Sequence, residues 1–207
     1  MTITNFSRIY QFKVVLQDAK PPIWRRIQVP ESYNFWDLHC AIQDAMGWSD
    51  CHLHSFTVRR DQKQPLSADI HIGIPSEDDF EKILPGWDVP VKKYYTKEGQ
   101  QSLYWYDFGD DWKHTVLLEK VLPRDIGAKY PQCIAGKRAC PPDDCGGVWG
   151  YEELLETVKS KRGARYKELV EWLGLEKGEE FDSETFRPEE VGFDNPVERL
   201  KLMMSFK

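Results

Sequence analysis

Carboxylate and imidazole side chains gather around one short stretch of the chain, residues 104–114. Asp107, Asp110 and Asp111 surround a glycine corner, and His114 follows. Carboxylates and imidazoles together are ligands for Zn²⁺, Mn²⁺ or Fe²⁺, and a metal ion held by them can activate water for hydrolysis. The structural alternative is that the carboxylates cap a tight turn while His114 is a hydrogen-bonded core residue. Both interpretations predict a turn of defined geometry.

Two more histidines alternate along a second predicted strand. His52 and His54 face the same side of residues 52–58, with their Cα atoms about 7 Å apart from the rise of a strand. They are either core residues or partners of the carboxylates, if the two strands are neighbours. The resulting candidate polar cluster is His52, His54, Asp107, Asp110, Asp111 and His114.

Three cysteines form a second candidate metal site. Cys133, Cys140 and Cys145 lie in one stretch rich in glycine and proline. Thiolates suit Zn²⁺, and a histidine from the polar cluster would complete a tetrahedron. Their spacing is wider than the Cys-x-x-Cys pair of strong zinc motifs, so small buried thiols or a labile disulfide are the alternatives. Zinc is the one cofactor that this pattern predicts.

Hydrophobic periodicity predicts the elements that position these groups. Alternation of apolar and polar residues predicts strands, and apolar residues every three to four positions predict helices. The strands cover 10–16, 23–29, 52–58, 68–74 and the two arms of a hairpin from 104 to 121. The first helix covers 35–46, with Ser32 or Asn34 as its N-cap and Gly47 at its end. Later helices cover 151–158, 166–173 and 196–204, whereas 124–149 reads as irregular loop.

These elements predict an α+β fold. We expect a mixed, mainly antiparallel sheet of five or six strands with helices packed on it. Residues 1–175 form the domain, and residues 176–207 form a tail that Phe181, Phe186 and Phe193 fasten to the same body.

Composition narrows the classes of function. The net charge of −6 argues against a wide nucleic-acid footprint, although a local basic strip is compatible with it. Most of the eight tryptophans fall at strand or helix periodicity, which favours the core over a base-stacking platform. The first residues lack the pattern of a secretory signal, no run approaches the roughly 18 apolar residues of a membrane span, and five cysteines fit reduced thiols. A cytoplasmic location is expected, while partners and oligomeric state are not indicated.

Four sequence blocks resemble the plasmid pRiA4b ORF-3-like proteins. They are Pro-x-Trp-Arg-Arg at 22–26, Gly-Trp with His-Leu-His-Ser-Phe at 47–56, Tyr-Asp-Phe-Gly-Asp-x-Trp-x-His at 106–114, and the cysteine block at 133–147 that runs into Gly150-Tyr151. The family also carries the label of a passenger of the IS1096 mobile element, with a resolvase-type name. The resemblance implies an α+β domain of bacterial or archaeal origin, and no established reaction.

Two classes of function follow. The first is a binding or adaptor protein associated with mobile elements, and the second is a metal-dependent hydrolase or nuclease that uses the His and Asp cluster. The binding class is preferred because no pair of a nucleophile and a general base can be recognised in the sequence. Recombination is disfavoured because phosphate chemistry needs positive charge at the phosphate, and the basic run at 159–165 contains no aromatic platform.

Overall fold

The structure is a computed structural model that describes residues 6–59, 69–76, 82–177 and 179–205. These ranges contain four α-helices and eight strands, which confirms an α+β fold. The strands are β1 (Arg8–Leu16), β2 (Trp24–Pro30), β3 (His54–Val58), β4 (Ile70–Gly73), β5 (Ile83–Pro85), β6 (Gln101–Tyr106), β7 (Trp112–Pro123) and β8 (Gln132–Lys137). The helices are α1 (Phe35–Met46), α2 (Gly147–Ser160), α3 (Ala164–Trp172) and α4 (Pro196–Ser205), joined by short 3-10 turns η2 (Gly86–Asp88), η3 (Val91–Lys93) and η4 (Pro188–Glu190).

The described strands form one sheet in the order β5-β4-β3-β6-β7-β1-β2-β8. The β4–β5 pair is parallel and the other pairs are antiparallel, as expected for a mixed and mainly antiparallel sheet. The count is eight rather than five or six, because the two outermost strands, β5 and β8, have no clear alternation in the sequence.

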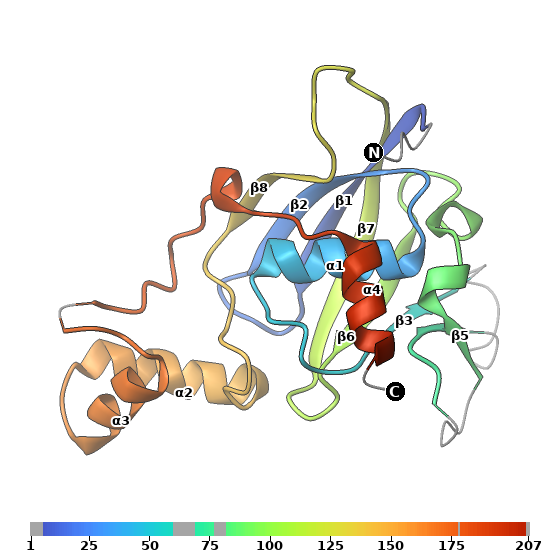
Figure 1. Ribbon diagram of the computed structural model, residues 1–207. Helices are drawn as coiled ribbons and strands as arrows, with labels where there is room; N and C mark the ends of the chain where they lie inside the picture. The colour runs from blue at the N-terminus through green and yellow to red at the C-terminus, as the bar shows by residue number, and fades with distance from the viewer. Residues whose placement is uncertain (1–5, 60–68, 77–81, 178, 206–207) are drawn as a thin grey trace.

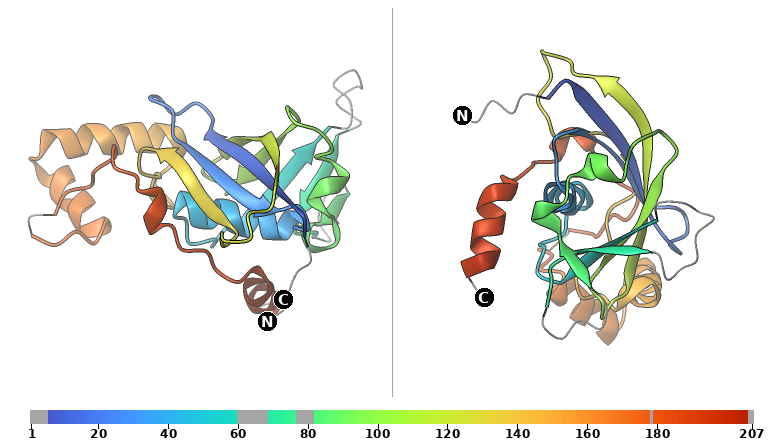
Figure 2. Two further views of the ribbon diagram at one scale, coloured as in Figure 1. Left: turned by 90° about the horizontal axis from the view of Figure 1, so that it is seen from above. Right: turned by 90° about the vertical axis from the view of Figure 1, so that its right-hand side faces the viewer.

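The sheet curves around α1, which forms the centre of the core (Figure 2). Ten of the twelve residues of α1 are buried. The helix starts at Asn34, whose side chain accepts from the Asp37 N–H in a capping box, and it ends at Gly47 in the left-handed conformation. Asn34 rather than Ser32 is therefore the N-cap. Inward residues of β1, β6 and β7 pack against α1 and complete the core.

The predicted hairpin is present, with β6 and β7 as its arms. Tyr104 lies opposite His114 and Tyr106 opposite Trp112. The turn between them places Asp107 and Asp111 at positive φ (53° and 59°), where carboxylate side chains are tolerated better than most. The Asp107 Oδ1 atom accepts hydrogen bonds from the Gly109 N–H at 3.0 Å and the Asp110 N–H at 3.3 Å. The carboxylate of Asp107 thus helps to define the turn.

The prediction of irregular structure over residues 124–149 is wrong at two places. Residues 132–137 form β8, which pairs antiparallel with β2, and α2 begins at Gly147. Glycine, proline and polar residues hide both elements in the sequence. Backbone hydrogen bonds to a neighbouring strand, rather than local propensity, decide that β8 is a strand.

The C-terminal tail returns to the body of the molecule after α2 and α3, which project to one side (Figure 1). Phe181 and Phe193 pack against the core, and the Phe186 ring lies 3.6 Å from the Arg25 guanidinium. In α4, Arg199 forms a 2.6 Å ion pair with Asp44 of α1. These contacts are consistent with a tail packed on the same body.

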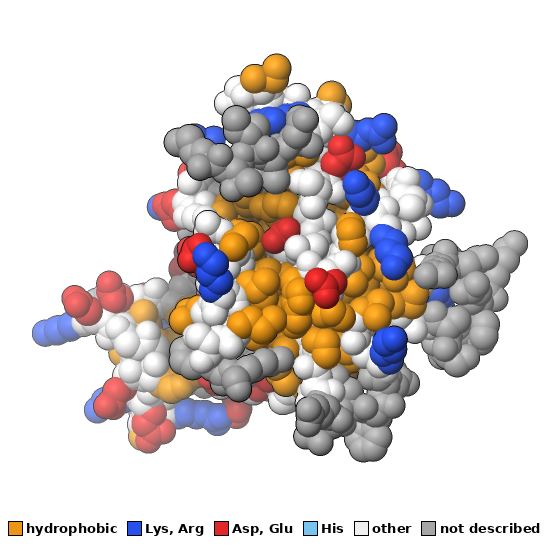
Figure 3. Space-filling view, turned by 45° about the vertical axis from the view of Figure 1, so that its right-hand side comes forward, with side chains coloured by type: hydrophobic (Ala, Val, Ile, Leu, Met, Phe, Trp, Pro, Cys, Tyr) orange, Lys and Arg blue, Asp and Glu red, His pale blue; other side chains and the backbone are white. Residues whose placement is uncertain are grey.

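The helix α4 is held by polar contacts at its edge and buries none of its residues fully. Val197, Leu202 and Met204 stay exposed on it. Hydrophobic side chains gather in the middle of the molecular face on this side (Figure 3). None of the helices in the described part of the chain combines the length and the apolar character that crossing a bilayer requires.

A buried arginine joins several of these elements. Arg25 of β2 is 1% exposed and donates hydrogen bonds to the carbonyl oxygens of Ala45 at 2.7 Å, Trp24 at 3.0 Å and Lys137 at 3.2 Å. Burial lowers the pKa of Arg25, which reflects the cost of taking the charge out of water. The guanidinium thereby links the end of α1 to β8 and, through Phe186, to the tail.

Histidines also lie deep in the core. His114 is fully buried, and neither of its ring nitrogens has a hydrogen-bond partner within the described residues. Burial lowers its pKa to about 3, and the nearby backbone of Tyr104 and Trp112 opposes only part of this effect. His114 is therefore neutral in the folded protein at pH values where the unfolded chain would already be protonated.

We predict that Arg25→Met destabilises the protein by about 2–4 kcal/mol, because it leaves buried carbonyl oxygens without donors. Urea unfolding measures the change. Arg26→Met is the matched control on the same strand: Arg26 is half-buried and pairs with Glu119 at 2.6 Å, so its loss should cost about 1 kcal/mol or less. An equal loss of unfolding free energy in both variants would show that the carbonyl contacts of Arg25 contribute no additional stability.

We also predict that His114→Leu makes the protein less sensitive to acid. Below about pH 6.5 the unfolded chain binds a proton at His114 that the folded protein does not, so stability falls as the pH falls. Between about pH 7 and about pH 4.5, the variant should lose about 2–3 kcal/mol less free energy of unfolding than the parent protein. Urea unfolding at both pH values gives these differences.

Val116→Ala is the control for this experiment, because Val116 is fully buried on the same strand and does not titrate. It should lower stability by a similar amount at both pH values. If the pH dependence of His114→Leu equals that of Val116→Ala, the acid sensitivity does not come from His114.

Candidate metal centre at the hairpin end

Three segments that are far apart in the sequence meet at the hairpin end of the sheet. His52 precedes β3, Asp107 follows β6, and Asp144 lies in the loop between β8 and α2. The His52 Nε2 atom is 2.9 Å from Asp144 Oδ1 and 3.5 Å from Asp107 Oδ2. An imidazole therefore lies between two carboxylates, one from the hairpin and one from the cysteine-containing loop.

Hydrogen bonds to the loop hold it against the strands. The Ser49 N–H and hydroxyl both donate to Asp143 Oδ2, at 3.0 and 2.7 Å. The Trp48 Nε1–H donates to the Pro141 carbonyl oxygen at 3.0 Å, and the Gly146 N–H donates to Asp110 Oδ2 at 3.0 Å. The position of Asp144 next to His52 follows from these bonds on either side of it.

Two glycines allow the loop to approach this closely. Gly147 has φ +68°, and a Cβ atom there would lie 2.4 Å from the Asp110 carbonyl oxygen. A Cβ atom at Gly150 would lie 1.9 Å from the Cys145 carbonyl oxygen. Only glycine fits such backbone contacts, so the Gly-Gly pair and Gly150 fix how α2 starts beside the hairpin.

Cys51 adds a thiol to this site. One ligand atom from each of Cys51, His52 and Asp144 lies within 4.8 Å of the other two. Bond lengths of 2.0–2.3 Å around a tetrahedral zinc ion separate its ligands by roughly 3.3–3.8 Å, so small side-chain rotations would bring the three atoms into range. Sulfur, nitrogen and oxygen are all ligands that Zn²⁺ accepts.

The His52 Nε2 atom lies where a cation could contact it together with the carboxylates. It is buried and within ion-pair distance of Asp144, and it makes no hydrogen bond of good geometry within the described residues. In the tautomer with its proton on Nδ1, the imidazole offers the Nε2 lone pair to an ion that the carboxylates also contact. Cys51 and Asp144 are exposed and His52 is half-buried, so the site is open to solvent.

The other predicted members of the polar cluster have different surroundings. Asp110 accepts from Gly146, and Asp111 pairs with Lys113 at 2.8 Å. His54 is 2% exposed and stacks on His39, with ring centroids 3.4 Å apart, and burial lowers its pKa well below the usual value. His114 is in the core. The structure thus brings the side chains of His52 and Asp107 together, while the side chains of the other four make different contacts.

The three predicted cysteine ligands do not form one group in the described structure. Cys133 lies in β8, where its Sγ atom is 3.6 Å from the Ala135 carbonyl oxygen. Burial raises the pKa of Cys145 to about 12 and also raises the pKa of Cys133 and Cys140. These half-buried thiols would have to lose their protons to bind a metal.

Sequence reasoning missed Cys51 and Asp144. Cys51 directly precedes His52, and Asp144 lies within the Pro-Pro-Asp-Asp-Cys run of the fourth block. A thiol and a carboxylate are suitable metal ligands, but the sequence gives no sign that Cys51 and Asp144, far apart along the chain, lie close together. Only the folding of the loop onto the hairpin brings them together.

Comparisons with known proteins agree with this architecture. The sequence profile of the plasmid pRiA4b ORF-3-like proteins matches residues 8–190. An uncharacterized protein, y4hQ, from Sinorhizobium fredii is 32% identical over 169 residues, which are 81% of this chain and 82% of that protein. The crystal structure of a protein of unknown function, MM3350 from Methanosarcina mazei Go1, has 43% sequence identity and a TM-score of 0.79, covering 91% of this chain and 98% of the other. This chain belongs to the plasmid pRiA4b ORF-3-like family.

Proposed function

We propose that this protein is a binding protein that holds a divalent transition metal, Zn²⁺ above all, through Cys51, His52 and Asp144. The observation that carries the proposal is that one ligand atom from each of these three residues lies within 4.8 Å of the other two, while His52 Nε2 makes no hydrogen bond of good geometry within the described residues. A thiolate ligand favours Zn²⁺ over Mg²⁺ or Ca²⁺, which prefer oxygen ligands only.

A metal at this position would cross-link elements that are otherwise joined by single hydrogen bonds. The ligands come from the segment before β3 and from the loop before α2, and Asp107 of the hairpin lies beside them. Binding to the folded chain alone would raise stability by mass action. This supports a role in fixing the surface of a binding or adaptor protein, which suits the association of the family with mobile elements.

Asp107 is placed to support the site from the hairpin. Its Oδ1 atom is engaged in the turn, and its Oδ2 atom faces His52. The same Nε2 atom would hold the metal, so it would carry no N–H for Asp107 to accept, and the carboxylate instead adds negative charge beside the ion. Asp107 would therefore act on the metal through its charge.

We predict that the purified protein binds one Zn²⁺ and that Cys51→Ala and His52→Ala each weaken this binding by roughly ten-fold or more, because a ligand is lost. Elemental analysis gives the stoichiometry, and titration against a competing chelator gives the affinity. Cys133→Ala is the matched control, a cysteine outside the proposed site, and should bind as the parent protein does. If the protein binds no zinc, or if Cys133→Ala lowers the affinity as much as Cys51→Ala, the site is wrongly assigned.

Hydrolysis is the second candidate function, favoured by the openness of the site. Three protein ligands leave one coordination position of Zn²⁺ free, as in catalytic zinc sites, and two of the three residues are exposed. Zinc bound there would supply a Lewis acid. Asp107 is the carboxylate placed to accept a proton next to it.

If the protein is a hydrolase, the zinc-loaded form should cleave bis-p-nitrophenyl phosphate, and Asp107→Asn should lower the rate by roughly 100-fold or more through loss of the proton acceptor. Zinc affinity of the same variant shows whether the metal is still bound. Absence of turnover by a zinc-loaded protein, or equal rates for Asp107→Asn and the parent, would leave the binding role alone.

A further inference from the structure

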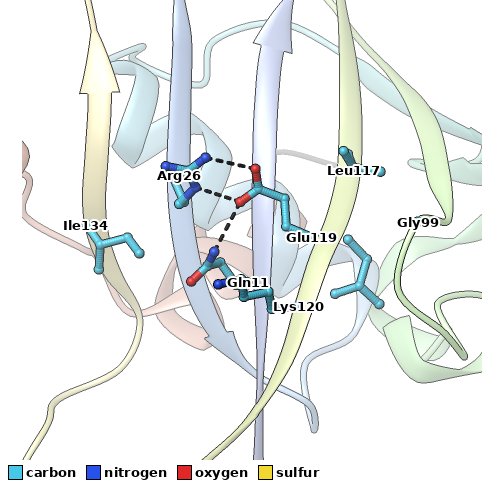
Figure 4. Close-up of a pocket in the computed structure, with 8 residues that line it drawn as sticks. Gln11, Arg26, Gly99, Leu117, Glu119, Lys120 and Ile134 are labelled. Atoms are coloured by element: carbon cyan, nitrogen blue, oxygen red, sulfur yellow. Dashed lines mark hydrogen bonds and ion pairs between the residues drawn. The ribbon is translucent and has the colours of Figure 1, made fainter.

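The face of the sheet that points away from α1, called the outer face here, is not covered by the described helices. In Figure 2, α1 and α4 lie on the opposite side of the strands. Figure 4 looks onto the outer face across β8, β2, β1 and β7, with α1 behind the strands. Its side chains are mostly half-buried, since they contact one another but no second layer.

The outer face is basic within an acidic protein. Five cationic residues project from these four strands, namely Lys13, Arg26, Lys113, Lys120 and Lys137. Glu119 lies among them and Asp111 lies beside Lys113, so these seven residues carry a formal charge of +3. The whole chain carries −6, so the charge on this face has the opposite sign to the charge of the whole protein.

Two tryptophans lie on the outer face among the cations. The Trp24 ring has Lys13 Nζ and Arg26 Cζ each 5.2 Å from its centroid, and Trp105 has Lys113 Nζ at 5.1 Å. Both tryptophans are half-buried, and the Trp105 ring also packs against Phe108, with ring centroids 4.6 Å apart. Three strand spacings separate β2 from β6, which puts the two rings about 15 Å apart, the length of two or three extended nucleotides.

Further along the strands, beyond Trp24, the outer face is hollowed and rich in hydrogen-bonding groups. An open hollow of about 640 Å³ is lined by Gln11, Arg26, Leu117, Glu119, Lys120 and Ile134, among others. Arg26 donates to both carboxylate oxygens of Glu119, and Gln11 Nε2 also donates to Glu119 at 3.1 Å (Figure 4). The same chain of bonds continues from Gln11 to Gln28 and on to Gln132.

We propose that the outer face binds single-stranded nucleic acid. Stacking of bases on aromatic rings and pairing of cations with the phosphate backbone are the two interactions that such binding needs, and this face carries both half-buried tryptophans and cations. The bases of a duplex are stacked on one another, so they cannot use the two rings. None of the residues named on this surface belongs to the Cys51, His52 and Asp144 group, and the proposal does not depend on a metal there.

Fluorescence anisotropy of a labelled oligothymidylate of about 12 nucleotides tests the proposal, at about 25 mM and about 200 mM salt. We expect a dissociation constant on the order of micromolar at low salt and weaker binding at high salt. Trp24→Ala should weaken binding by roughly ten-fold, whereas Trp24→Phe, which keeps a ring, should recover most of it.

Charge is tested with a matched pair of double variants. Lys13→Glu with Lys137→Glu changes the outer face and should lower the salt slope by roughly 1.4, the value for two lost phosphate contacts on a single strand. Lys92→Glu with Lys159→Glu makes the same change in net charge at exposed positions on η3 and α2, outside this face. It should bind nearly as the parent does. Circular dichroism confirms that each variant is folded.

Three outcomes would overturn the proposal. The first is no binding at low salt, and the second is an equal loss of affinity in both double variants. The third is tighter binding of a polyglutamate peptide than of the oligonucleotide, which would assign the face to an acidic protein partner. Equal affinity of Trp24→Ala and the parent would also exclude base stacking on that ring.

Discussion

One buried cation connects most of this molecule. The Arg25 guanidinium donates to the last turn of α1 and to β8, and it stacks against Phe186 of the tail. A charge so deeply buried is stable only where its N–H groups have acceptors, so the parts that supply those acceptors must be in place together. The pairing of β8 with β2 and the course of the loop that follows β8 are set by this requirement. The candidate site depends on that loop.

The hairpin end combines structural and chemical roles in the same side chains. One oxygen of Asp107 satisfies backbone N–H groups of the turn, while the other faces His52. Asp110 closes the turn against the loop through Gly146. Interpretations of these aspartates as turn residues or as site residues are therefore compatible, since the turn uses one carboxylate oxygen of Asp107 and leaves the other beside His52. The turn interpretation concerns Oδ1 of Asp107, and the site interpretation concerns its Oδ2.

Membership of the family gives the fold of this chain. Fold does not determine function, so any chemistry has to be argued from the geometry of the sites. Two surfaces of the one sheet are then distinct. Its hairpin end holds thiol, imidazole and carboxylate groups, and its outer face holds cations, tryptophans and amides. The positive charge of the outer face is hidden in the net charge of the chain, because the chain carries 34 acidic against 28 basic residues.

Local patterns determined much of the fold. Alternation along β1, β2 and the β6–β7 hairpin, and the spacing of apolar residues in α1 with its Asn34 cap, follow from side-chain period and backbone sterics within each element. Tertiary structure alone decided the rest. β8 is a strand because β2 offers it hydrogen bonds, and Cys51 and Asp144 become neighbours because Ser49 and Trp48 bind the loop that carries Asp144. No period within a single element encodes a contact between distant segments, so only the tertiary structure shows that Cys51, His52 and Asp144 lie close together.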